Sequence, residues 1–105
     1  MSHYLIRKEA ARELAEAAAW YDREAASGLG AALLTEFEAR LETALKLPGA
    51  GTIVAKTKAG TPVRRYRLKR FKRYAILMAE IHGMPTVLAF ACSSRRPGYW
   101  RKRLG

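Results

Sequence analysis

Several residue types that stabilise small extracellular or metal-bound domains are scarce in this chain. It has one cysteine, Cys92, and two histidines among 105 residues. An internal disulfide is therefore impossible, and a cysteine-rich zinc module is excluded. No apolar run approaches the roughly 20 residues that cross a bilayer, and the first residues lack the apolar stretch of a signal peptide. We expect a cytoplasmic protein without a transmembrane segment, a metal ion or another cofactor.

Acidic residues are nearly absent from the second half of the chain. Residues 1–47 carry six Lys/Arg and eight Asp/Glu, whereas residues 48–105 carry fourteen Lys/Arg and a single acid, Glu80. The net charges of −2 and +13 add up to the +11 of the whole chain. A region of one sign attracts anions, which indicates nucleic acid, an acidic protein or a membrane surface as partner. The alternative is a solvated basic face without a specific ligand.

The first half has the pattern of two helices. Residues 8–26 are rich in Ala, Glu and Leu, and Ser27-Gly28 predicts the end of this helix, with Gly28 as a left-handed cap. A second helix is predicted from about Leu29 to Leu47, where Pro48-Gly49 stops it. Because the connection between them is short, the two helices should form an antiparallel hairpin.

The second helix has an apolar face and a charged face. The apolar face is a stripe at helical spacing, formed by Leu33, Phe37, Leu41 and Leu45 and widened by Leu34 and Ala44. On the other face the spacing predicts two ion pairs, Glu36–Arg40 and Glu42–Lys46. The stripe should therefore face the core of the protein.

The second half changes to the pattern of strands. Residues 63–68 alternate, with Tyr66 and Leu68 on one face and Arg65 and Arg67 on the other. Residues 74–81 predict a further strand, and the apolar run 86–92 fits a central strand buried on both faces. Two weaker segments complete the pattern: a short first strand at 3–7, and a Gly/Pro/Thr loop at 48–62 with an irregular strand at 53–54.

The expected order is strand, helix, helix, strand, strand, strand. The helical hairpin must bury its stripe, and only the sheet is available to cover it. The predicted fold is therefore α+β: a two-layer sandwich with the hairpin packed on a small antiparallel sheet, in a single domain over residues 1–105. The basic tail 93–105 should hold a short helix capped by Ser93 or Ser94.

The sequence lacks the residue arrangements that most common catalytic mechanisms require. Cys92 ends an apolar strand and is expected to be a buried, inert thiol. Ser93 and Ser94 have no histidine near them in sequence. The Gly-Ala-Gly stretch at 49–51 lacks both the lysine of a P-loop and a dinucleotide fingerprint. Paired acid–base catalysis has only Glu80 in the basic half.

A dense cationic surface with aromatic residues remains as the candidate site. Lys and Arg neutralise phosphates, and aromatic rings can stack on bases. Trp100 could instead pack the tail onto the sheet. The surface comprises Lys56, Lys58, Arg64, Arg65, Arg67, Lys69, Arg70, Lys72, Arg73, Arg95, Arg96, Tyr99, Trp100, Arg101, Lys102 and Arg103.

Three segments and the order of the elements resemble a known superfamily. The segments are Trp20-Tyr21 in the first helix, the stretch from Val63 to Phe71, and the tail Arg95-Arg96-Pro97-Gly98-Tyr99-Trp100-Arg101. Together they resemble the RelE/ParE toxins of bacterial type II toxin–antitoxin modules, including many plasmid-stabilisation proteins. The resemblance implies a small growth inhibitor that a cognate acidic antitoxin neutralises in a toxin–antitoxin hetero-oligomer, with no membrane partner.

The superfamily contains two mechanisms, and the resemblance implies residues for one of them. RelE-type members cleave messenger RNA on the ribosome, whereas ParE-type members inhibit DNA gyrase. A metal-independent endoribonuclease would use the RNA's own 2′-hydroxyl as nucleophile. Its phosphate would be bound and stabilised by Arg65, Arg67, Arg73 and Arg95, and Tyr99 would orient it or relay a proton. The remaining basic residues and Trp100 would bind the target.

The sequence departs from the RelE pattern at two places. Tyr74 falls where RelE has an arginine, and Cys92-Ser93-Ser94 falls where many relatives with this tail carry a histidine. The gyrase alternative has no residue that marks a gyrase contact. A plain nucleic-acid-binding domain is the third class that the sequence leaves open.

Overall fold

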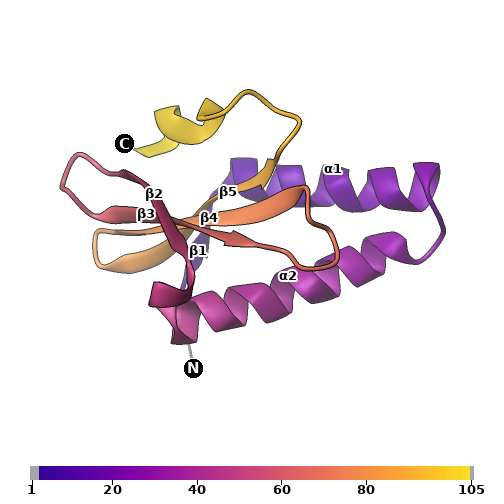
Figure 1. The fold of residues 1–105 in the computed structure, drawn as a ribbon, viewed down its shortest axis with the longest axis horizontal. Helices are drawn as coiled ribbons and strands as arrows, with labels where there is room; N and C mark the ends of the chain where they lie inside the picture. The colour runs from indigo at the N-terminus through magenta and orange to yellow at the C-terminus, as the bar shows by residue number, and fades with distance from the viewer. Residues whose placement is uncertain (1–2, 105) are drawn as a thin grey trace.

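The structure is a computed structural model that describes residues 3–104. It consists of two helices and a five-stranded sheet (Figure 1). The helices are α1 (Lys8–Glu24) and α2 (Leu29–Lys46). The strands are β1 (Leu5–Ile6), β2 (Thr52–Lys56), β3 (Pro62–Arg67), β4 (Tyr74–Ile81) and β5 (Met84–Cys92). Two short 3-10 helices follow α2 and β5: η1 (Pro48–Ala50) and η2 (Tyr99–Leu104). The predicted α+β class with a helical hairpin packed on a sheet is confirmed.

The sheet is mixed, which corrects the prediction of an antiparallel sheet. Its strand order is β1-β5-β4-β3-β2, and the neighbours from β2 to β5 are antiparallel. Strand β1 runs parallel to β5. The predicted order counted no strand in the segment 48–62, although an irregular strand was expected at 53–54, and β2 forms there. Because β2 adds one reversal of chain direction between β1 and β5, the two strands run the same way.

The helices bury their apolar side chains on one face of the sheet. The ring of Phe37 is 4% exposed and packs edge-on against Phe90 of β5, with 5.6 Å between the ring centroids. Of the predicted stripe, Leu33, Phe37, Leu41 and Ala44 are buried and Leu45 is partly buried. Leu34 is 38% exposed, so that part of the prediction is wrong. It lies on the flank of the stripe, where the sheet no longer covers α2.

The connection between the helices differs in detail from the prediction. Helix α1 ends at Glu24, before the predicted stop, and Gly28 instead precedes α2 with a φ of +93°. The Asp22 carboxylate accepts hydrogen bonds from the backbone N–H groups of Gly28 (3.1 Å) and Gly30 (2.8 Å). A side chain of α1 therefore caps the free N–H groups of α2, which fixes the hairpin.

The tail packs on the opposite face of the sheet. In Figure 1 it lies on the side of the sheet away from α2. Trp100 is buried in a second apolar cluster with Val63, Leu77 and Leu88. The short helix η2 begins at Tyr99, so the predicted cap at Ser93 or Ser94 is wrong. In residues 3–104 no helix combines the length and the apolar character that crossing a membrane requires.

Candidate anion-binding cleft

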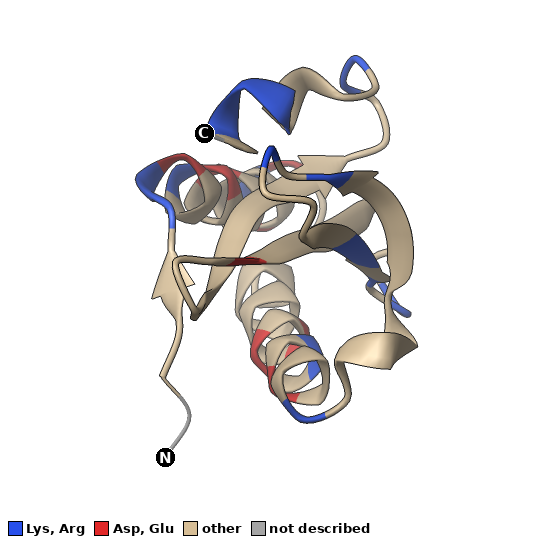
Figure 2. Cartoon of the chain, turned by 90° about the vertical axis from the view of Figure 1, so that its left-hand side faces the viewer, with Lys and Arg blue, Asp and Glu red and all other residues tan. Residues whose placement is uncertain are grey.

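A cleft of about 450 Å³ lies between the tail and the sheet face that the helices leave open. We call it the arginine cleft. Its walls come from β3, the start of β4, the end of β5 and the tail. Figure 2 shows Lys and Arg on the tail, on the strands and on both helices, whereas most Asp and Glu lie on the two helices. The predicted site residues in its lining are Arg65, Arg67, Lys72, Arg73, Arg95, Arg96, Tyr99, Trp100 and Arg101.

Arg65 and Arg67 reach this cleft because they alternate along β3. Tyr66 between them is buried on the helix side, where its hydroxyl donates a hydrogen bond of 2.8 Å to the Pro48 carbonyl. Arg65 is half-buried and Arg67 is exposed, and among residues 3–104 neither forms an ion pair. The cleft lining contains no Asp or Glu. The charges of Arg65 and Arg67 are therefore available to a ligand.

Two residues of α2 hold the connection between β3 and β4, which carries Arg73. The Glu36 carboxylate accepts hydrogen bonds from the backbone N–H groups of Lys69 and Arg70. Arg40 donates through Nε to the carbonyl oxygen of Arg67 at 2.8 Å. The predicted Glu36–Arg40 pair is therefore wrong, because otherwise unpaired backbone groups bind both side chains, while an exposed ion pair is weak. The Glu42–Lys46 pair forms at 2.8 Å.

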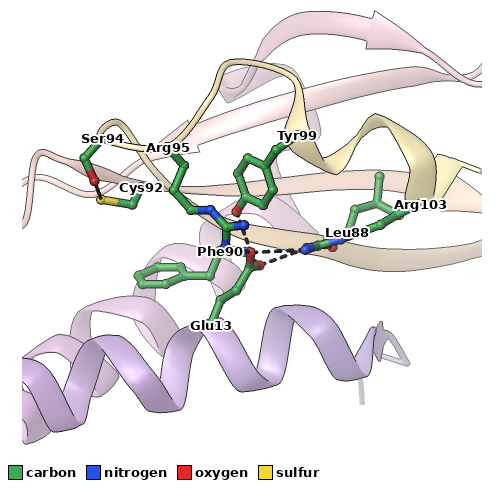
Figure 3. A network of polar contacts seen from close by, with 8 residues as sticks. All are labelled: Glu13, Leu88, Phe90, Cys92, Ser94, Arg95, Tyr99 and Arg103. Atoms are coloured by element: carbon green, nitrogen blue, oxygen red, sulfur yellow. Dashed lines mark hydrogen bonds and ion pairs between the residues drawn. The ribbon is translucent and has the colours of Figure 1, made fainter.

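A carboxylate from α1 organises the tail, and sequence analysis did not select it. The Glu13 carboxylate accepts a hydrogen bond of 2.5 Å from the Tyr99 hydroxyl (Figure 3). It also accepts from Arg103 at 2.9 and 3.2 Å, from Arg95 at 3.3 Å and from the Phe90 backbone N–H at 3.1 Å. In the sequence Glu13 is one of several acids on α1 and has no distinguishing signal.

The same carboxylate changes the ionisation of its neighbours. Burial and the hydrogen bond to Glu13 raise the pKa of Tyr99 well above its ordinary value. The hydrogen bond to Glu13 also raises the pKa of Arg103. The two guanidinium carbons of Arg95 and Arg103 lie 3.9 and 5.2 Å from the centroid of the Tyr99 ring. Tyr99 is therefore neutral, with its hydroxyl proton bound to Glu13, and its ring contacts the guanidinium groups of Arg95 and Arg103.

The other predicted residues lie outside the arginine cleft. Arg64 donates to the Gly51 carbonyl at 3.0 Å and lines a separate pocket beside the end of α2. Arg103 is bound to Glu13 and to the Leu88 carbonyl. Trp100, by contrast, belongs to the cleft lining but is only 7% exposed, which favours its role in packing the tail over stacking on a base. The remaining ones are exposed on β2, on turns and in η2: Lys56, Lys58, Lys69, Arg70 and Lys102.

Cys92 is not the buried thiol that the sequence predicted. It is half-buried at the edge of the cleft, with Sγ 3.0 Å from the Ser94 hydroxyl. The apolar run ends here, and the final residue of β5 emerges from the core. Burial raises the pKa of this thiol, but hydrogen bonds with Ser94 and Tyr74 and the charge of Arg73 outweigh it, so the pKa is lower than usual. Burial, with Cys92 nearby, raises the pKa of Tyr74 to about 12.

The lowered pKa predicts the pH dependence of Cys92 alkylation. Because the thiolate reacts, the rate with iodoacetamide should reach half its plateau below the pH of about 8.5 expected of a free thiol. Ser94→Ala removes a hydrogen bond to the thiolate and should move this midpoint upward. A midpoint at or above that of a cysteine-containing peptide measured in parallel would contradict the assignment.

The described residues offer no metal-binding cluster. Within residues 3–104, no three His, Cys, Asp or Glu side chains gather where they could hold an ion.

Comparisons with known proteins find a solved structure of similar fold and no match to a protein-family model or a curated protein. A chain of the solved structure "Chromosomal ParDE TA system from P. aeruginosa" is similar, with a TM-score of 0.66 and 14% sequence identity. The match covers 88% of this chain and 96% of that one. The likeness confirms the predicted RelE/ParE-like fold, with two helices on a five-stranded sheet.

Proposed function

We propose that the chain is the toxin of a type II toxin–antitoxin pair and that the arginine cleft is its working surface. The observation that carries the proposal is the cleft, which Arg65, Arg67 and Arg73 line together and whose lining contains no acid. Cationic side chains held together without counter-ions have little structural use and suit an anionic ligand. The fold shared with a ParDE TA system supports the same assignment.

The partner that fits this surface is an acidic antitoxin in the cytoplasm. A partly disordered acidic chain could fold over the basic half, and each new Arg–carboxylate contact would offset part of the cost of ordering it. The expected assembly is a toxin–antitoxin hetero-oligomer. An antitoxin bound over the arginine cleft would prevent the target from binding there.

For the activity we propose ribosome-dependent cleavage of messenger RNA without a metal ion. The 2′-hydroxyl oxygen of the RNA attacks the adjacent phosphorus and loses its proton to water, while the bond to the 5′-oxygen of the next nucleotide breaks. That oxygen takes a proton from water, so the products are a 2′,3′-cyclic phosphate and a 5′-hydroxyl. Arg65, Arg67, Arg73 and Arg95 would bind the phosphate and stabilise the negative charge that develops on it. Because the Tyr99 proton is bound to Glu13, we assign Tyr99 to orienting Arg95 and the phosphate and not to relaying a proton.

Non-catalytic inhibition of DNA gyrase is the second candidate. Two observations favour it: the fold neighbour belongs to a ParDE TA system, and the cleft lining has neither a histidine nor a carboxylate to act as general base. In this case the same arginines would bind an acidic surface of the target and take no part in bond cleavage.

Two assays with the purified protein separate the candidates. Primer extension on a translated message should reveal cuts that require the ribosome and disappear in Arg65→Ala plus Arg67→Ala. Supercoiling by purified gyrase should proceed normally in the presence of the protein. Inhibited supercoiling with intact message would overturn the ribonuclease assignment and its catalytic roles, and absence of both effects would contradict both mechanisms.

A further inference from the structure

We infer that Glu13 is a positioning residue, which holds Arg95 at the rim of the arginine cleft and so increases the affinity of the cleft for a phosphodiester. The inference rests on the proposed role of the cleft in binding RNA. It concerns an acid on α1, outside the cleft lining, that acts on the cleft through one arginine. It reverses the simple electrostatic expectation that an acid near a cationic site weakens anion binding.

The position of Glu13 is fixed by the edge of β5. Strand β1 pairs with β5 only at Leu5 and Ile6, and Arg7 donates its N–H to the Val87 carbonyl before the chain enters α1. Beyond that point side chains take the place of a neighbouring strand. Glu13 accepts from the Phe90 N–H at 3.1 Å, and Arg103 donates to the Leu88 carbonyl at 3.1 Å. Glu13 is thereby anchored to backbone.

Arg95 is the most exposed partner in this arrangement. Its side chain is 53% exposed, whereas those of Glu13 and Arg103 are 11% and 16% exposed. It reaches Glu13 through one nitrogen, Nη1, at 3.3 Å, and its guanidinium lies over the Tyr99 ring. The other nitrogens, Nε and Nη2, remain as donors for a phosphate. A long exposed arginine otherwise loses rotamer freedom on binding, and this cost falls when its position is set beforehand.

The charge balance supports a net attraction. The Glu13 carboxylate is shared by two guanidiniums, so the three side chains together carry a net charge of +1. The Glu13 carboxylate is 11% exposed, is surrounded by hydrogen-bond donors and does not itself line the cleft. Loss of Glu13 would have two opposite effects on anion affinity: Arg95 would be freed, which weakens binding, and the positive field in the cleft would rise, which strengthens it. We expect the first effect to be the larger.

The test measures affinity for a fluorescein-labelled single-stranded RNA octamer by anisotropy. The variants are Glu13→Gln, Arg95→Ala, their double mutant, and Glu16→Gln as a matched control on the same helix. Each is measured well below the lowest melting temperature of the set. Glu13→Gln should bind about fivefold to tenfold more weakly, as Arg95→Ala does, and the double mutant should bind no more weakly than either. Glu16→Gln should stay within about twofold of the parent or bind slightly more tightly.

The salt dependence and an NMR measurement distinguish positioning from general loosening of the tail. Loss of one phosphate contact should lower the slope of log affinity against log salt by about 0.7 in both single variants. In the unaltered protein, rotation of the Arg95 guanidinium should be hindered and that of Arg96 free, a comparison that does not depend on the folding of Glu13→Gln. Tighter binding by Glu13→Gln, additive losses in the double mutant, or free rotation of Arg95 would each overturn the inference. Failure of the parent to bind the octamer would overturn it together with the ribonuclease assignment, and the gyrase candidate would stand.

Discussion

Replacing Arg65 and Arg67 together with alanine is expected to abolish growth arrest while leaving the protein folded. Both side chains leave β3 on the cleft side, and among the described residues neither has an acidic partner to lose. Their removal takes two positive charges from the point where a phosphate or an acidic protein surface would bind. The free energy of unfolding should change by no more than about 1 kcal/mol, because neither guanidinium belongs to an apolar cluster.

A matched double substitution provides the control. Arg12→Ala with Arg23→Ala removes the same charge from α1, where both residues are exposed. This variant should arrest growth as the parent does. Viable counts after induction, with soluble protein quantified for each variant, measure the outcome. A folded Arg65→Ala plus Arg67→Ala variant that is as toxic as the parent would exclude this site under either mechanism.

Phe37→Ala is expected to lower the free energy of unfolding by about 3–5 kcal/mol. The ring lies between α2 and the sheet, is 4% exposed, and packs edge-on against Phe90. Truncation would leave a cavity and remove this aromatic contact at once. Urea denaturation followed by circular dichroism gives the value. Leu34→Ala on the same helix is the control, since that side chain is 38% exposed and should cost much less. A loss under about 1 kcal/mol for Phe37→Ala would mean that the stripe does not face the sheet.

The elements with a strong internal pattern could be predicted from sequence, whereas β2 was predicted only as an irregular strand at 53–54 and not as a member of the sheet. Strand β4 lies at the predicted residues, and both helices lie within two residues of their predicted ends. Strand β2 is an edge strand in a Gly/Pro/Thr-rich segment, and it exists through its pairing with β3, which includes a shift of register between Ile53 and Ala55. Such pairing depends on the next strand and on the turn between them, and it leaves only a weak pattern within β2 itself. The same omission produced the wrong direction for β1.

The site shows the same division between local and distant information. Arg65 and Arg67 could be placed on one face because a strand alternates with period two. Glu13 could not be selected, because its role comes from Phe90, Tyr99 and Arg103, which lie far along the chain. The error at Glu36 and Arg40 has the same origin, since the backbone groups that bind them belong to the connection after β3. Spacing on a helix shows which residues are neighbours and does not show which contact prevails.

The most direct test of the toxin assignment is growth of a bacterial culture on induced expression of the chain, alone and together with the acidic antitoxin that we propose as its partner. We predict that the chain alone stops growth. Co-expression should restore growth and yield a stable complex of the two proteins, because the acidic partner would cover the arginine cleft. Normal growth with the chain expressed alone, soluble and in high amount, would contradict the assignment.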